Sequence, residues 1–145
     1  MTGCTNHKKC IKKALNETQA LCDKENLRLT ETRRNVLEII WQSHKAITAA
    51  EIMEKLGNKQ PPVTYRALEF LESNGIIHKV ASLNAYVGCA SPAREHASQL
   101  LICTTCKTVE EHPVDLSTLL PSTGFHAEQS YNEVLGVCEG CYGGK

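Results

Sequence analysis

Apolar residues recur at helical spacing through the first half of the chain. Between residues 10 and 26 they fall on one face of an amphipathic helix, and the same spacing follows Thr30 and Thr48. Threonine is a favoured N-cap, so these two residues predict the starts of a second and a third helix. Gly57 predicts the end of the third helix, because glycine adopts the left-handed conformation of a C-cap without strain.

The pattern changes after a fourth helix. The proline pair at residues 61–62 suits a first helical turn, and Gly75 ends the segment. Residues 76–80 and 85–89 then have the composition of two strands joined as a hairpin. A winged helix-turn-helix is predicted by this order of elements: three helices, a fourth helix of the kind that reads DNA, and a hairpin.

The remaining sequence predicts a second, smaller unit. A short polar connection that contains a proline, residues 90–97, marks the boundary. Beyond it we expect strands at 99–102, 108–112, 125–131 and 134–137, with a short helix at 116–120. The predicted fold is therefore α+β, with a winged-helix DNA-binding domain at 1–89, a hinge at 90–97 and a small α/β dimerisation domain at 98–145.

Composition narrows the class of protein. Of 145 residues, 41% are hydrophobic and 22% charged, which is typical of a soluble globular protein. We expect no membrane span and no export signal, and hence a reducing compartment in which cysteines bind metal more often than they form disulfides. The net charge is zero, but residues 1–80 carry a balance of +4 and residues 81–145 a balance of −4. The basic half suits a polyanion.

Two CxxC pairs near the end of the chain carry the strongest chemical signal. Cys103 and Cys106 form the first pair and Cys138 and Cys141 the second, with 31 residues between the pairs. Four thiolates from two tight turns are the closed tetrahedral ligand set of structural zinc. A disulfide or a thioredoxin-like redox motif is the alternative interpretation. A closed site leaves no open position for a substrate, so we expect neither an enzyme nor a small-molecule substrate.

Further potential ligands surround the predicted boundary. They are His78, Cys89, His96 and Glu111, with Glu110 as the alternative carboxylate if the strand register differs by one residue. An isolated histidine on a strand is more often an ordinary polar residue, so spacing alone does not define a site. Near the N-terminus, Cys4, His7 and Cys10 form a C-x-x-H-x-x-C pattern, for which thiols without a metal are the simpler interpretation.

Several motifs together resemble one known family. They are residues 26–30 (NLRLT), 61–71 (PPVTYRALEFL), 75–80 (GIIHKV), 101–106 (LICTTC) and 136–141 (GVCEGC). This combination resembles the ferric uptake regulator superfamily, and within it the bacterial zinc uptake regulators. The resemblance extends from about residue 20 to Cys141.

The resemblance implies a ligand assignment and a function. The four CxxC cysteines would hold a structural zinc, and His78, Cys89, His96 and Glu111 a second, sensed zinc, giving two per subunit. Thiolate favours zinc over ferrous or manganous ions, so Cys89 decides the choice. The chain would then act in the bacterial cytoplasm as a homodimeric, zinc-loaded repressor of zinc uptake genes on palindromic operator DNA. The alternatives are a regulator of the same fold that senses iron, manganese, nickel or peroxide, and a zinc-stapled protein-interaction module.

DNA contacts are expected from the fourth helix and its surroundings. A helix in the major groove would present Arg66 to a guanine and Tyr65 to a thymine methyl or a phosphate. The other candidate DNA contacts are Thr64, Arg28, Arg33 and Lys79.

Overall fold

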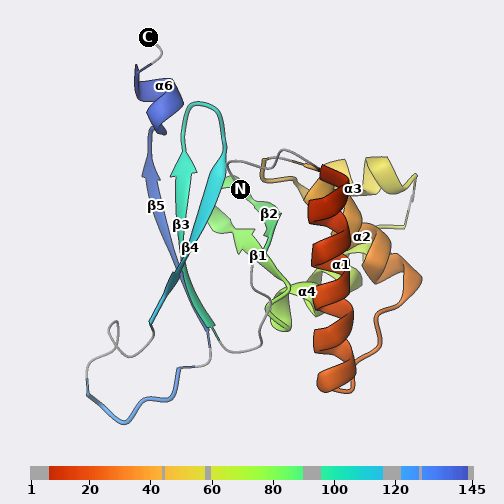
Figure 1. The fold of residues 1–145 in the computed structure, drawn as a ribbon. Helices are drawn as coiled ribbons and strands as arrows, with labels where there is room; N and C mark the ends of the chain where they lie inside the picture. Colours follow the sequence, from red (N-terminus) through yellow and green to blue (C-terminus); the bar gives the residue numbers. More distant parts are fainter. Residues whose placement is uncertain are drawn as a thin grey trace.

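The computed structural model describes residues 7–43, 45–57, 60–89, 96–115, 122–127 and 129–143. Within these ranges, helices form the first part of the chain, and a two-stranded hairpin and a three-stranded sheet follow (Figure 1). The α+β class predicted from the sequence is confirmed. No helix in the described ranges has the length and apolar character needed to cross a bilayer.

The N-terminal helices begin and end where local side chains dictate. They are α1 (His7–Lys24), α2 (Glu31–Gln42), α3 (Ala49–Leu56) and α4 (Pro61–Ser73). At the start of α2, the Thr30 hydroxyl accepts the backbone N–H of Arg33 at 3.3 Å. At the start of α3, Thr48 and Glu51 cap each other's backbone N–H groups at 3.2 and 3.1 Å, a capping box. Gly57 ends α3 with φ +66°, as predicted.

The helices and the hairpin share one apolar core. Its fully buried side chains include Val36, Leu37, Ile40, Ile52, Leu68, Leu71 and Ile76. The hairpin pairs β1 (Ile77–Val80) antiparallel with β2 (Ala85–Gly88) through a 3₁₀ turn, Ala81–Leu83. We call this hairpin the wing. Ile47 and Tyr86 exchange backbone hydrogen bonds of 3.0 and 2.8 Å, which fix the wing to the helical part.

The end of the wing packs tightly on α2. A Cβ atom placed on Gly88 would lie 2.4 Å from the indole ring of Trp41. Only glycine therefore lets the strand approach the indole this closely. The next residue, Cys89, donates its backbone N–H to the Ile76 carbonyl at 3.1 Å, which continues the hairpin by one residue.

The second part of the chain forms a sheet in the order β4-β3-β5. Its strands are β3 (His96–Cys103), β4 (Val109–Val114) and β5 (Gln129–Gly136), and a short helix α6 (Glu139–Gly143) follows. β3 lies in the centre, antiparallel to β4 and parallel to β5. Figure 1 shows α6 at one end of this sheet, beyond the ends of β3 and β5.

The sequence-based boundaries in this part differ from the structure in two places. One strand, β5 (Gln129–Gly136), replaces the strands predicted at 125–131 and 134–137, because Asn132 and Glu133 continue the pairing with β3 instead of interrupting it. His96 and Ala97, predicted as hinge, belong to β3. Helix α6 was not predicted. The predicted helix at 116–120 and hinge residues 90–95 lie outside the described residues.

The wing and the sheet pack directly against each other. Val80 and Val87 of the wing form a buried cluster with Leu100, Ile102 and Val109 of β3 and β4. This apolar cluster joins the two parts, so the wing lies between the helices and the sheet (Figure 1). Any ligand group on the inner face of the wing therefore lies close to the sheet.

Candidate metal centres and nucleic-acid interface

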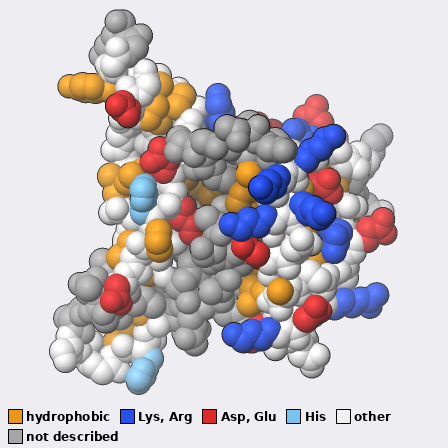
Figure 2. Space-filling view, in the orientation of Figure 1, with side chains coloured by type: hydrophobic (Ala, Val, Ile, Leu, Met, Phe, Trp, Pro, Cys, Tyr) orange, Lys and Arg blue, Asp and Glu red, His pale blue; other side chains and the backbone are white. Residues whose placement is uncertain are grey.

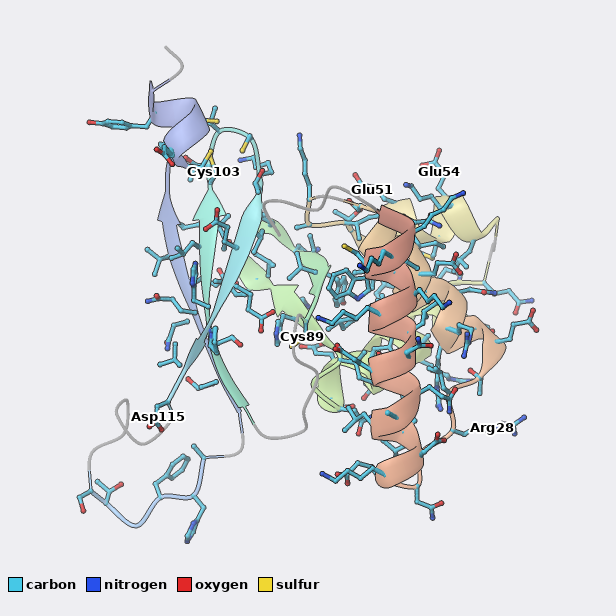
Figure 3. The ribbon with its side chains drawn as sticks, in the orientation of Figure 1. Arg28, Glu51, Glu54, Cys89, Cys103 and Asp115 are labelled. Carbon is cyan, nitrogen blue, oxygen red and sulfur yellow. The ribbon has the colours of Figure 1, made fainter. Side chains whose placement is uncertain are left out.

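The four CxxC cysteines converge at one end of the sheet. Cys103 ends β3, Cys106 lies in the turn that leads to β4, and Cys138 and Cys141 flank the start of α6 (Figure 3 labels Cys103). All four sulfurs lie within 4.8 Å of one another, and Cys106 Sγ and Cys138 Sγ are 3.8 Å apart. Four sulfurs bound to one zinc at about 2.3 Å would be separated by about 3.8 Å. The cluster therefore fits a tetrahedral zinc ion.

Hydrogen bonds favour the thiolate form at two of the four cysteines, Cys103 and Cys106. The N–H groups of Cys106 and Cys138 both donate to Cys103 Sγ at 3.4 Å. These bonds lower the pKa of the Cys103 thiol to about 5. The Thr108 hydroxyl, 3.0 Å from Cys106 Sγ, lowers the pKa of Cys106. Cys141 has its pKa raised to about 12 because its thiol hydrogen-bonds to the sulfurs of Cys138 and Cys106.

A second ligand cluster joins the wing to the sheet. His78 lies in β1, Cys89 directly follows β2, and Glu111 lies in β4. His78 Nε2 is 2.8 Å from Glu111 Oε1, and the Cys89 thiol donates to the same oxygen at 3.4 Å. Imidazole, thiolate and carboxylate are all zinc ligands, and these three atoms lie within 4.8 Å of one another. This donor set fits a divalent ion that would bridge the wing and the sheet.

The strand register decides which glutamate belongs to this cluster. Glu111 pairs with Leu100 and faces the wing, whereas Glu110 pairs with Leu101 and forms an ion pair with His112 at 3.5 Å. Adjacent residues of a strand point to opposite faces, so only one of the two glutamates can reach His78. Glu111 is that residue, and the alternative Glu110 is wrong.

Sequence reasoning missed one member of this cluster. The Ser98 hydroxyl donates to Glu111 Oε1 at 2.7 Å, and the Ser98 side chain is buried. The hydrogen bond holds the carboxylate in the orientation that faces His78 and Cys89. No spacing signal marks a single serine, because the contact depends on the pairing of β3 with β4. The fourth candidate ligand, His96, is the first residue of β3, two positions before Ser98.

The first turns of α4 expose part of the predicted DNA-reading surface. Tyr65 is 51% exposed, and Arg66 next to it is exposed as well. Thr64 is fully buried on the core face of α4, so its predicted DNA contact is wrong. Its position four residues before Leu68 places both side chains on the same buried face.

The basic candidates differ in how far they are available to DNA. Arg28 and Lys79 are exposed. Arg33 is partly buried: its guanidinium lies 3.6 Å from the centre of the Phe70 ring, and its Nη1 donates to the Arg28 carbonyl at 2.6 Å. The Phe70 contact joins α2 to α4, so Arg33 has a structural role beside any contact with phosphate. Figure 2 shows Lys and Arg side chains gathered over the helical part and few over the sheet.

Comparisons with known proteins agree with this architecture. The model of the Ferric uptake regulator family matches residues 24–118. The zinc uptake regulation protein of Escherichia coli (strain K12) is 33% identical over 137 residues, covering 88% of this chain and 80% of the relative. A solved structure of a zinc uptake regulator complexed with zinc and DNA has a TM-score of 0.79 and 31% identity, covering 92% of this chain and 95% of that one.

Two structures of one regulator, XcZur, add a contrast between states. The holo form has a TM-score of 0.79 and 34% identity, covering 89% of this chain and 96% of that one. The apo form has a TM-score of only 0.53 at 30% identity, although 92% of this chain and 99% of that one are covered. The arrangement of the chain is therefore closer to the holo form.

A winged helix joined to a small sheet by potential metal ligands defines a class of transcription regulators, and these are not enzymes. The chain belongs to the ferric uptake regulator family, which confirms the resemblance seen in the sequence.

Proposed function

We propose that the protein is a zinc-sensing transcriptional repressor that binds palindromic operator DNA as a zinc-loaded homodimer. One observation carries the proposal. His78 of the wing, Cys89 directly after the wing and Glu111 of the sheet converge on one point, so the ligand set connects the DNA-reading part to the rest of the molecule.

Zinc is the ion that these ligands favour. Cys89 provides a soft thiolate, and thiolate with imidazole favours zinc over iron or manganese. We include His96 as the fourth ligand, which would complete a tetrahedral set of two imidazoles, one thiolate and one carboxylate. The cluster at Cys103, Cys106, Cys138 and Cys141 would hold a separate structural zinc, which makes two ions per subunit.

The residues at the junction account for regulation. When bound, zinc would supply the positive charge that holds the three ligand groups together. The wing is then fixed against β4, and through Ile47 and Tyr86 so are the helices. Because zinc favours the arrangement that fits DNA, it shifts the population towards that arrangement. By reciprocity, operator DNA tightens zinc binding by the same factor.

A dimer follows from the size of the reading surface and from the sheet. One recognition helix reads few base pairs, so two copies on a palindrome are needed for tight binding. β5 lies at the edge of the described sheet, and its exposed apolar residues Val134 and Leu135 continue into Val137 and Tyr142. We infer that a second copy covers this surface, and that the dimer acts in the bacterial cytoplasm on genes for zinc uptake.

The test is zinc-dependent DNA binding. A fluorescently labelled AT-rich palindromic duplex is titrated with the protein, and anisotropy is followed at buffered free zinc concentrations. The wild type should bind tightly only with zinc, and Cys89→Ser should lose this response while it still folds and dimerises. Cys10→Ser, which removes a thiol outside both clusters, is the matched control and should behave as wild type.

Two results would refute the proposal. Equal DNA binding with and without zinc would leave the protein-interaction module as the better interpretation. A stronger response to ferrous or manganous ions than to zinc would assign the sensor to another metal.

A further inference from the structure

The tip of the wing makes a second contact with the sheet, separate from the ligand cluster. The backbone N–H groups of Ala81 and Ser82 donate to the two carboxylate oxygens of Glu133, at 2.5 and 3.2 Å. Glu133 lies in β5, so the bonds connect segments 52 and 51 residues apart. Hydrogen bonds that a carboxylate accepts from backbone amides are about twice as strong as neutral ones.

The contact occupies the opposite end of the wing from the metal ligands. His78 and Cys89 lie near the base of the hairpin, whereas Ala81 and Ser82 form its tip. The apolar cluster that contains Val80 lies in between. The wing is thus held at both ends, and only the base uses metal ligands.

The arrangement that contains this contact is the one that resembles the zinc-bound relatives. The TM-score is 0.79 to the zinc-and-DNA complex and to the holo form, and 0.53 to the apo form. The Glu133 bonds require the wing tip to lie on β5. They therefore stabilise this arrangement against any in which the wing moves away from the sheet.

We propose that Glu133 is a positioning residue for DNA binding: it holds the wing tip against the sheet independently of the metal ligands and thereby lowers the zinc concentration that the regulator needs. This inference rests on the proposed function. The apparent zinc affinity equals the intrinsic affinity multiplied by the fraction of protein already in the binding-competent arrangement. Glu133 would raise that fraction without touching the metal.

The test compares Glu133→Ala and Glu133→Gln with the wild type in the anisotropy assay at buffered free zinc. Glu133→Ala removes both charge-assisted bonds. It should raise the half-point, which is the free zinc concentration that gives half-maximal DNA binding, by roughly tenfold. Glu133→Gln keeps one acceptor oxygen, so its half-point should lie between those of the wild type and Glu133→Ala. At saturating zinc all three proteins should reach the same DNA affinity, because zinc then supplies the missing stabilisation. A variant that was only misfolded would lose this plateau.

The matched control is Glu54→Gln, which removes one negative charge from an exposed position of α3, on the helical side of the molecule away from the sheet (Figure 3). It should leave the half-point unchanged. Amide hydrogen exchange gives a direct second readout. In zinc-loaded protein, the amides of Ala81 and Ser82 should exchange faster in Glu133→Ala than in wild type.

Two outcomes would overturn the inference. In the first, Glu133→Ala has the wild-type half-point and unchanged exchange at Ala81 and Ser82. In the second, Glu133→Ala binds DNA more tightly than the wild type at all zinc concentrations. That result would indicate that the Glu133 carboxylate competes with DNA for the amides of Ala81 and Ser82. If wild-type DNA binding does not depend on zinc, the proposed function fails instead. In that case the role of Glu133 is tested by amide exchange and DNA affinity alone. If both are the same in Glu133→Ala as in the wild type, the inference about Glu133 is overturned as well.

Discussion

Replacing Ser98 by alanine tests whether Glu111 must be held in orientation for the ligand cluster to bind metal. The Ser98 hydroxyl donates to Glu111 Oε1 at 2.7 Å from a side chain that is 1% exposed. The substitution removes one oxygen atom and leaves the Cβ atom in place, so the packing around it should change little. The effect should therefore appear in metal binding rather than in folding.

The magnitude follows from the role of the hydrogen bond. Loss of an outer partner of a metal ligand typically costs about 10- to 100-fold in metal affinity, or about 1.4–2.8 kcal/mol. Glu111 also contacts His78 and Cys89, and both of these are themselves proposed ligands. Ser98 lies outside the ligand set, and we expect its replacement to lower the zinc affinity by about tenfold or more.

The assay is competition for zinc with a chromophoric chelator, followed by the anisotropy titration on DNA. Ser43→Ala is the matched control, because Ser43 caps the exposed end of α2 far along the chain from the cluster and its hydroxyl donates to the Lys45 carbonyl. Both variants should retain the zinc of the cysteine cluster. A Ser98→Ala protein whose zinc affinity lies within twofold of the wild type would refute the reasoning.

Three further predictions address the other parts of the structure. Cys103→Ser should leave the sheet poorly folded and the protein monomeric by size-exclusion chromatography, because structural zinc contributes apparent binding energies of about 10–16 kcal/mol; normal dimerisation would argue against a structural ion. Gly88→Ala should lower the free energy of unfolding by about 1–3 kcal/mol in a urea titration, because the new Cβ would lie 2.4 Å from the Trp41 ring; Gly140→Ala, where a Cβ would meet nothing within 4 Å, is the control. Arg66→Ala should weaken DNA binding. If Arg66 contacts a phosphate, the salt dependence of binding should fall by about one counterion, and if it contacts a base the salt dependence should not change. An unaltered DNA affinity would show that Arg66 is not part of the interface.

Features that depend on a few neighbouring residues could be predicted from the sequence. Thr30 and Thr48 accept backbone N–H groups within the first turn of the helix that each begins, so their capping role can be predicted from the neighbouring sequence. The two CxxC pairs are local chelating turns for the same reason. Thr64 is an error that the sequence itself could have prevented. The spacing of Thr64 to Leu68 and Leu71 already assigns it to the buried face of α4.

Features that depend on register or on distant contacts could not be predicted. The choice of Glu111 over Glu110 required the pairing of β4 with β3. Ser98 and Glu133 act through contacts that form only when β3, β5 and the wing are assembled. Arg33 was predicted only as a DNA contact, because its stacking on Phe70 depends on the packing of α2 against α4. In each case the residue is visible in the sequence, but the neighbour that gives it its role is set by the folded structure.

The central claim is that a removable ion at His78, Cys89 and Glu111 controls DNA binding, while the ion at the four cysteines maintains the fold. Its most direct test is zinc content per subunit by elemental analysis, before and after mild chelation, with operator binding and circular dichroism measured on the same samples. We expect about two ions to fall to about one, with loss of DNA binding, unchanged secondary structure, and recovery when zinc is returned. DNA binding that persists at one ion per subunit, or a fold that collapses when the first ion is removed, would contradict the account.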